Sequence, residues 1–329
     1  MAYEREKQIA IEAVTLASQL CSAVRTEIVG VASLAKDDKS PVTIADFGSQ
    51  ALVCHHVRAG FPRDPIVGEE DSTDLQKPEN ASTLAQVVRY VRRFQPDATA
   101  ESVCHWIDAG NGQVGTRFWA LDPIDGTKGF LRRDQYAVAL GKIERGVVTI
   151  GVLGCPDLVA SSEPAPNGAG SLVVAVRGEG TWWQPLVGNG RWQQLRVSDR
   201  TEPANARILH SVEKAHTNTD EIGSLAAHLG IAAPQVPLDS QAKYAVLAAG
   251  AGDVLLRLIS PKRPDYKEKI WDQAAGSLVI TEAGGRITDL DGKPLDFAHG
   301  RSLEKNRGIL ATNGPLHEPL LAGLRAIGA

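Results

Sequence analysis

Apolar residues recur at helical spacing in the first part of the chain. Residues 4–29 place alanine, valine, leucine or isoleucine on one helical face at nearly every turn, which predicts a long amphipathic helix. A polar turn over residues 36–43 precedes a second helical pattern over residues 44–57. Residues 72–115 are mostly polar, and only residues 84–94 show helical periodicity. We therefore expect two long helices, followed by a polar excursion from the helical layer. This excursion is a candidate mobile segment and contains one short helix.

The middle of the chain is rich in β-forming runs, and its last third mixes strands with helices. The middle runs predict strands over residues 136–143, 147–153, 171–177 and 180–183. Two prolines and two glycines make residues 163–170 a surface loop. The last third predicts strands at 208–209 and 254–258 and helices at 220–229, 243–249 and 271–283. This alternation is typical of an α/β layer.

The length and texture of the chain predict two domains. A chain of 329 residues is too long for a single small core. Its pattern changes near residues 202–206, from β-forming runs to alternating strands and helices. We expect an α+β domain over residues 1–203 and an α/β domain over residues 204–329. Neither a Gly-x-Gly-x-x-Gly fingerprint nor a P-loop occurs between a strand and a helix, so dinucleotide and NTPase functions lack their usual motif.

Composition narrows the possible partners. The formal charge of −4 gives no basic field, which argues against nucleic acid held by its phosphates. No apolar run approaches the roughly 20 residues of a membrane span, and the charged start of the chain is no signal peptide. The four separated cysteines predict buried free thiols. We expect a cytoplasmic location; monomer and homodimer both remain open.

The candidate chemistry centres on Asp122-Pro-Ile-Asp-Gly-Thr127, at the end of an apolar run. Pro123 cannot donate to a sheet ladder, so we expect the backbone to turn there and to bring Asp122 and Asp125 together. Gly126 tolerates unusual backbone angles, and the free amides of such a turn can face an anion. Two carboxylates beside exposed amides suit Mg²⁺ bridging to a phosphate. An ordinary acidic turn is the alternative.

Three further acidic features stand elsewhere in the sequence. Glu69 and Glu70 follow a short apolar run, where a solvated loop would explain them equally. Asp46 falls in the first turn of the helix predicted for residues 44–57, where it could simply complement the helix dipole. Asp272 opens the helix predicted for residues 271–283, where it could serve as a helix cap.

The order of these motifs resembles the lithium-sensitive, Mg²⁺-dependent phosphatase superfamily that includes inositol monophosphatase and fructose 1,6-bisphosphatase. The acidic pair, the Asp-Pro-Ile-Asp-Gly-Thr turn and Trp271-Asp272 before a helix follow one another as in that superfamily. Its 3′(2′),5′-bisphosphate nucleotidase branch is resembled most in the blocks 122–131, 154–156, 238–244, 266–272 and 294–297. The resemblance implies a layered αβαβα sandwich with the metal site between the two domains.

The resemblance also implies a role for each acid. One Mg²⁺ would be held by Glu69, Asp122 and the carbonyl of Ile124, and a second by Asp122, Asp125 and Asp272. Asp46 and Glu70 would serve a third, weaker ion or the attacking water, which Asp46 and Thr127 would polarise. Carboxylates this close repel one another unless cations compensate them, so two to three Mg²⁺ ions fit the grouping.

Substrate contacts are implied for both domains. Gly126 and Thr127 would steady the phosphate oxygens. His216, Ser240, Lys243 and Arg257 would contact a nucleotide, with Lys243 and Arg257 facing a second phosphate, since a buried dianion needs fixed cations. Taken alone, Lys243 and Arg257 could be solvated surface charges, and His216 could be a polar loop residue.

The expected activity is therefore a phosphomonoesterase acting on a small bisphosphate nucleotide. It would remove the 3′-phosphate of adenosine 3′,5′-bisphosphate, act on 3′-phosphoadenylyl sulfate as well, and be inhibited by Li⁺. Two alternatives stay open: an inositol phosphate 1-phosphatase, and a nucleotide or metal sensor without catalysis.

Overall fold

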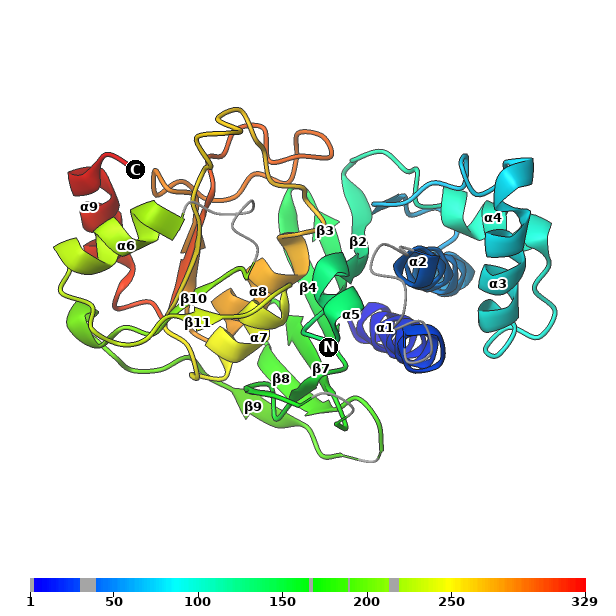
Figure 1. The fold of residues 1–329 in the computed structure, drawn as a ribbon, viewed down its shortest axis with the longest axis horizontal. Coiled ribbons are helices and arrows are strands. Elements are labelled where there is room, and N and C mark those ends of the chain that lie inside the picture. The colour runs from blue at the N-terminus through cyan, green and yellow to red at the C-terminus, as the bar shows by residue number, and fades with distance from the viewer. Residues whose placement is uncertain (1–2, 30–39, 166–167, 189, 213–218) are drawn as a thin grey trace.

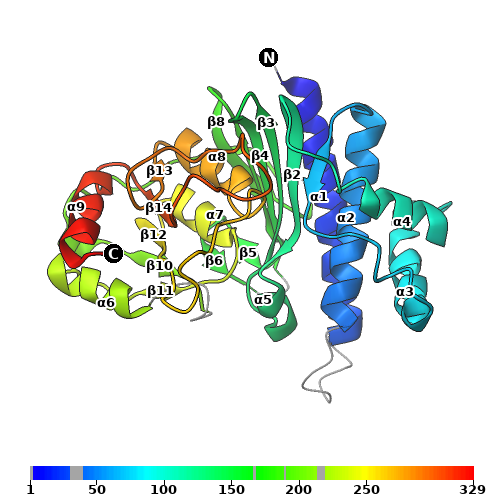
Figure 2. The ribbon, with the colours of Figure 1, turned by 90° about the horizontal axis from the view of Figure 1, so that it is seen from above.

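The computed structural model describes residues 3–29, 40–165, 168–188, 190–212 and 219–329, and these form five layers. Helices cover one face of a first sheet, two helices lie between that sheet and a second one, and two further helices cover the far side of the second sheet (Figures 1 and 2). Three clusters of buried apolar side chains fill the spaces between these layers. The predicted αβαβα sandwich is confirmed.

The outer helical layer consists of α1 (Glu4–Val24), α2 (Ser40–Gly60), α3 (Ala81–Val91) and α4 (Ala100–Asp108). A π-helical turn, Arg25–Val29, extends α1 to the predicted length. The second helix begins at Ser40, four residues before its predicted start, because Pro41 in its first turn is favourable at a helix N-terminus. Asp46 therefore lies in the second turn and not in the first, which weakens the dipole interpretation of this residue.

The segment predicted as a polar excursion is a packed part of this layer. Helices α3 and α4 both contact α2, and α4 was missed by the periodicity analysis. A capping box in which Thr99 and Ser102 exchange hydrogen bonds starts α4. Serine at the fourth position is unusual for this motif, which favours glutamate or glutamine there, so the signal was easy to overlook.

The first sheet has seven strands in the order β1 (Ile66–Gly68), β2 (Arg117–Asp125), β3 (Ala137–Glu144), β4 (Val147–Cys155), β7 (Ser171–Val176), β8 (Gly180–Pro185) and β9 (Gln193–Leu195). Strands β1 and β2 are parallel, and all other neighbours are antiparallel. A two-stranded ribbon, β5 (Leu158–Val159) and β6 (Glu163–Pro164), corrects the prediction of a plain loop over 163–170. Two residues per strand give no detectable alternation.

The second sheet has the order β11 (Val236–Pro237), β10 (Ile208–His210), β12 (Val254–Arg257), β14 (Ile309–Thr312) and β13 (Arg286–Thr288). Between the sheets lie α7 (Ala242–Ala248) and α8 (Ala274–Glu282), and outside lie α6 (Thr219–His228) and α9 (His317–Ile327). No helix or strand was predicted after residue 283. The domain boundary predicted at residue 203 falls between β9 and β10 and stays a prediction.

Close packing of α8 on the first sheet depends on glycines. A Cβ atom at Gly151 of β4 would come within 2.6 Å of the carbonyl oxygen of Ala275, and one at Gly141 of β3 within 2.9 Å of the Cβ of Ala274. The C-terminal half of the chain therefore shares a core with the N-terminal sheet. All four cysteines are buried free thiols, as predicted. No described helix is long and apolar enough to cross a membrane.

We predict that Gly151→Ala destabilises the protein by about 1–3 kcal/mol, because the new methyl group meets backbone that cannot rotate away. Gly223→Ala in α6 is the matched control, since its Cβ would meet no atom within 4 Å and alanine favours a helix. Urea unfolding of both variants measures the difference. Equal free energies of unfolding would contradict the packing argument.

Candidate functional site

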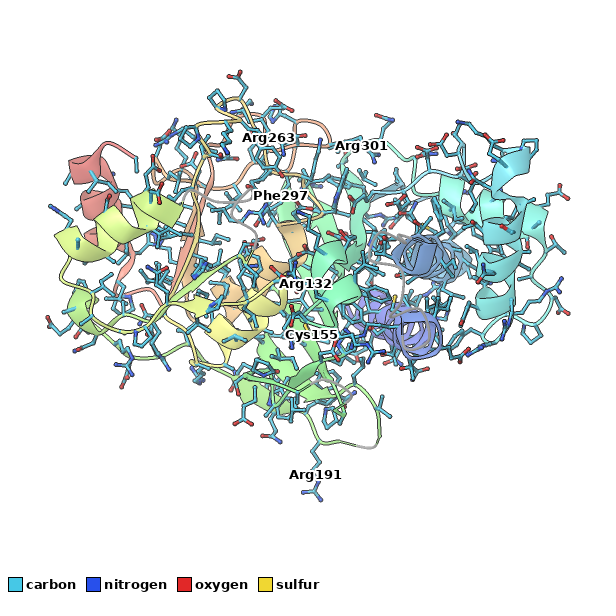
Figure 3. The ribbon with its side chains drawn as sticks, viewed as in Figure 1. Arg132, Cys155, Arg191, Arg263, Phe297 and Arg301 are labelled. Carbon is cyan, nitrogen blue, oxygen red and sulfur yellow. The ribbon has the colours of Figure 1, made fainter. Side chains whose placement is uncertain are left out.

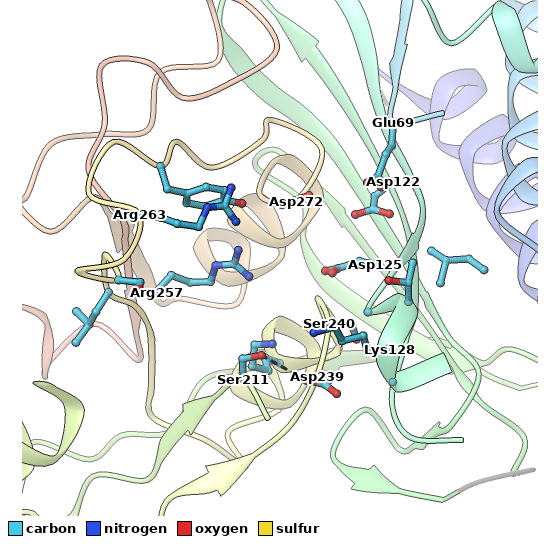
Figure 4. A pocket seen from close by; sticks show the side chains of 18 residues that line it. Glu69, Asp122, Asp125, Lys128, Ser211, Asp239, Ser240, Arg257, Arg263 and Asp272 are labelled. Carbon is cyan, nitrogen blue, oxygen red and sulfur yellow. Dashed lines mark hydrogen bonds between the residues drawn. The ribbon is translucent and has the colours of Figure 1, made fainter. Parts of the chain in front are cut away.

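One pocket between the two halves of the chain gathers most of the predicted site residues. Figure 4 shows acidic side chains on one side of it and arginines on the other. The predicted residues that line it are Glu69, Asp122, Ile124, Asp125, Gly126, Thr127, Ser240, Lys243, Arg257 and Asp272. They come from β2, α5 (Thr127–Arg132), α7 and β12, and from the segments just after β1 and just before α5, α7 and α8. Residues as far apart in sequence as Glu69 and Asp272 thus line one pocket.

Three predicted residues need separate mention. Asp46 of α2 and Glu70 do not line the pocket, but their charges reach its acids: Glu70 and Glu69 both act on Asp46, and Asp46 acts on Asp122. Both therefore lie just behind the pocket wall. His216 falls outside the described residues.

The Asp122 to Asp125 segment is a bulged strand and not a sharp stop. Asp122 pairs with Ala139 and Asp125 with Ala137, so two residues of β2, Pro123 and Ile124, stand opposite one residue of β3. The strand was predicted to end at Asp122. Pro123 is accommodated because the bulge leaves it outside the regular ladder, and the bulge carries both aspartates to the pocket.

Gly126 then lets the second half of the chain approach. It adopts φ of 90°, a left-handed conformation that glycine tolerates, and α5 begins at the next residue. A Cβ atom here would lie 2.9 Å from the Cβ of Ser240. Ser240 itself has φ of 64°, uncommon for a residue with a side chain. The two loops thus meet through backbone conformations that few other residues could adopt.

The acids of the site repel one another, and two of them, Asp46 and Asp122, are buried. Burial, followed by the charges of Glu69, Asp125, Asp272 and Asp46, raises the pKa of Asp122 well above its usual value. Burial and the charge of Asp125 do the same to the pKa of Asp272, although Arg257 opposes the shift. Burial and Glu70 raise the pKa of Glu69 to about 7. At neutral pH, part of the negative charge of this group of acids is therefore not compensated.

This acid set fits a divalent cation. The buried Oδ1 atoms of Asp46 and Asp122 have no hydrogen-bond partner among the described residues, although buried carboxylate oxygens are normally satisfied. Oxygen donors of this charge are what Mg²⁺ binds. Among the residues that the structure describes, no three acidic, histidine or cysteine side chains already surround one point closely enough to hold an ion. The residues fit, and binding would draw them together.

The ordinary explanation for Asp272 does not hold. The residue that caps α8 is Gln273, and it makes no side-chain cap hydrogen bond. Asp272 lies in the turn before the helix, is half-buried, and lines the pocket. The helix starts later than predicted because 269–273 form a bridge and turns.

Two cations that line the pocket, Lys243 and Arg257, are largely shielded from solvent. Lys243 of α7 is 4% exposed and donates to the Leu238 carbonyl at 3.1 Å, and burial lowers its pKa to about 8. Arg257 forms a two-point ion pair with Glu268, at 3.1 and 2.8 Å. Neither side chain is a solvated surface charge.

Several lining residues escaped the sequence analysis. Arg263 lies 4.5 Å over the ring of Tyr266, and both line the pocket. Figure 4 shows Arg263 on the side of Arg257, and Figure 3 shows where Arg263 lies in the whole molecule. The further residues missed are Lys128, Gly129, Ser211, Asp239, Leu258 and Ser260. Most stand on loops without periodicity. Tyr266 belonged to a block that carried the family resemblance, which was the available signal.

Comparison with known proteins identifies relatives along the whole chain. A profile of the inositol monophosphatase family matches residues 3–328. A Candida albicans protein named 3′(2′),5′-bisphosphate nucleotidase 1 is 41% identical, over 99% of this chain and 96% of its own. An Arabidopsis thaliana protein of the same name is 42% identical, over 99% and 97%. A rice (Oryza sativa) 3′(2′),5′-bisphosphate nucleotidase is 42% identical, over 98% and 94%.

Solved structures show the same fold at lower identity. Inositol monophosphatase from Anabaena superposes with a TM-score of 0.63 at 21% identity, covering 99% of this chain and 97% of its own. CysQ from Bacteroides thetaiotaomicron, described as a bacterial member of the inositol monophosphatase family, gives a TM-score of 0.59 at 18% identity, covering 95% and 98%.

The crowded acids predict how stability depends on pH without metal. A carboxyl whose pKa is raised by folding keeps its proton where the unfolded chain has lost it, so stability should fall as pH rises from 5 to 8 in a chelator. Asp122→Asn removes one such group. Between pH 5 and 8, the free energy of unfolding of this variant should fall less than that of the wild type, by about 1.4 kcal/mol for each unit by which the pKa of Asp122 is raised.

Thermal unfolding in EDTA at three pH values measures this slope. Asp199→Asn, at an exposed acid outside the pocket, is the control and should keep the wild-type slope. If Asp122→Asn and the wild type lose stability equally between pH 5 and 8, the repulsion between the buried acids has been misjudged.

Proposed function

The chain belongs to the inositol monophosphatase family and is a phosphatase, and we propose that it removes the 3′-phosphate of adenosine 3′,5′-bisphosphate, giving AMP and phosphate. Relatives that carry the name of this activity share 41–42% of their residues over nearly the whole chain. We include 3′-phosphoadenylyl sulfate as a second substrate, because it presents the same 3′-phosphate beside another anionic group.

The opposed charges of the pocket carry this proposal. Glu69, Asp122 and Asp125 stand on one side of the pocket and Arg257 and Arg263 on the other (Figure 4), and Asp272 and Lys243 also line it. A substrate with two anionic groups can place one against cation-bridged acids and the other against the basic wall. A substrate with a single phosphate would forgo the charge-assisted contact with the buried Lys243 and should therefore bind less tightly.

A divalent metal ion is the cofactor that the family brings, and we propose that it is Mg²⁺, with two to three ions bound. The residues that would hold them are Glu69, Asp122, the Ile124 carbonyl, Asp125 and Asp272, with Asp46 and Glu70 at the third site. When bound, such ions neutralise the phosphate and stabilise the leaving oxygen. The orphaned oxygens of Asp46 and Asp122 support this assignment.

We assign the attacking water to protein groups beside the acids. Asp46 and Thr127 would hold the water, and Asp46 would accept its proton, since burial and the nearby Glu70 and Glu69 raise the pKa of that carboxyl. Glu70 would help orient the water. Gly126 and Thr127 would contact the phosphate, and Ser240 and His216 the nucleoside.

A substrate panel tests the activity. We expect kcat/KM for adenosine 3′,5′-bisphosphate to exceed that for inositol 1-phosphate and inositol 1,4-bisphosphate, with Li⁺ inhibiting because a monovalent ion supplies too little charge. Preference for inositol 1-phosphate would overturn the proposal in favour of an inositol phosphatase. Nucleotide binding without phosphate release at saturating Mg²⁺ would indicate a sensor.

Lys243→Ala tests the role of the basic wall. We expect kcat/KM on adenosine 3′,5′-bisphosphate to fall about 10- to 100-fold, the cost of losing a charge-assisted hydrogen bond, whereas adenosine 3′-monophosphate should be affected much less. Lys293→Ala, at a lysine whose side chain is 64% exposed, should change neither. Equal losses on both substrates would mean that Lys243 acts on something other than the second phosphate.

A further inference from the structure

One turn of α2 directs three polar side chains toward the acidic segments. Asp46, Ser49 and Gln50 stand three and four residues apart, a spacing that puts side chains on one face of a helix. Ser49 and Gln50 are fully buried. Neither was singled out by the sequence analysis, and neither lines the pocket.

The side-chain amide of Gln50 forms hydrogen bonds with both the N–H and the carbonyl of Glu70. Its Oε1 accepts a hydrogen bond from the Glu70 amide at 3.1 Å, and its Nε2 donates to the Glu70 carbonyl. The same Nε2 also donates to the Ile107 carbonyl at 2.9 Å. One buried amide thus joins the acidic pair after β1 to the end of α4, with its donors and its acceptor all used.

Two glycines make the slot that receives this amide. A Cβ atom at Gly68 would lie 2.6 Å from Oε1 of Gln50, and a Cβ at Gly110 would lie 2.5 Å from Nε2. The two glycines are themselves joined by a hydrogen bond of 2.8 Å from the Gly68 amide to the Gly110 carbonyl. The backbone on both sides is therefore shaped around the Gln50 side chain.

Ser49 makes the corresponding contact with the other acidic segment. Its hydroxyl donates to the carbonyl of Pro123 at 2.8 Å. Pro123 stands in the bulge between Asp122 and Asp125, where the strand ladder no longer fixes the backbone. This hydrogen bond replaces the missing ladder contact.

We propose that Ser49 and Gln50 are positioning residues that set the separation between the acidic segments 69–70 and 122–125, and between both segments and Asp46. Mutually repelling carboxylates drift apart unless their backbones are anchored, and a single helical turn is a rigid spacer. The inference rests on the proposed function only in that these acids bind a divalent cation. Residues that orient metal ligands typically change metal affinity 10- to 100-fold when removed.

The test measures Mg²⁺ affinity by calorimetry without substrate, together with kcat and KM on adenosine 3′,5′-bisphosphate. Gln50→Leu and Ser49→Ala should each weaken Mg²⁺ binding, by about tenfold or more for Gln50→Leu. The nucleotide KM at saturating Mg²⁺ should stay within about twofold, because neither residue lines the pocket. Ser49→Thr, which keeps the hydroxyl, should restore the affinity lost in Ser49→Ala.

Asn313→Leu is the matched control for lost stability. Asn313 is also a buried amide that bonds backbone at both ends, to the Ser198 and Arg200 carbonyls and to the Leu316 amide, away from the pocket. It should lower the melting temperature as Gln50→Leu does, yet leave Mg²⁺ affinity within about twofold. Ser49→Ala, a milder change, keeps the test decisive if Gln50→Leu does not fold.

The outcomes separate this inference from the proposed function. Wild-type Mg²⁺ affinity in Ser49→Ala and in folded Gln50→Leu, or no heat of Mg²⁺ binding to the wild type, would overturn the positioning role. A wild type that binds Mg²⁺ but releases phosphate from none of the substrates would overturn the proposed activity alone, and the variants would still decide the positioning role.

Discussion

The repulsion between buried carboxylates is the constraint on which the rest of this structure depends. Asp46, Asp122 and Asp272 each have a pKa raised by burial and by neighbouring acids. Left to themselves, such groups would move apart or pull in water. The fold resists this by attaching each acid to a different rigid element, and a divalent cation would supply the missing charge.

The packing of the layers brings the elements that carry these acids together. Gly141 and Gly151 let α8 lie directly on the first sheet, and α8 follows the turn that holds Asp272. On the other face, α2 brings Asp46 up behind the acids. The C-terminal part of the chain supplies a third anchor, Arg301, which is labelled in Figure 3. Its side chain donates a hydrogen bond to the carbonyl of Gly68, and its guanidinium lies 4.9 Å over the ring of Trp271. It links the residues just before Glu69 and Asp272.

The predictions succeeded where the physical cause is local. Helix α1 was found from apolar periodicity, because one of its faces is buried along its length. The strands β3, β4 and β7 were found as β-forming runs, because nearly all of their residues are buried, and β8 was found as a run beside them. They failed where the cause lies elsewhere. The missed α4 is packed by α2, and β13 pairs with β14 over a long sequence separation. Short elements of this kind have too few residues to show a period of their own.

The site divides in the same way. The sequence by itself determined which acids are candidate metal ligands, because the type and order of Asp122-Pro-Ile-Asp-Gly-Thr and of the other acidic features resemble one phosphatase superfamily. Only the tertiary structure decided that Asp272 is no helix cap, that Arg257 is paired with Glu268, and that Ser49 and Gln50 hold the acidic segments. These are facts about which backbone atoms meet across the layers. Hydrogen bonds between distant segments depend on how the layers pack, and nothing in the local sequence specifies that.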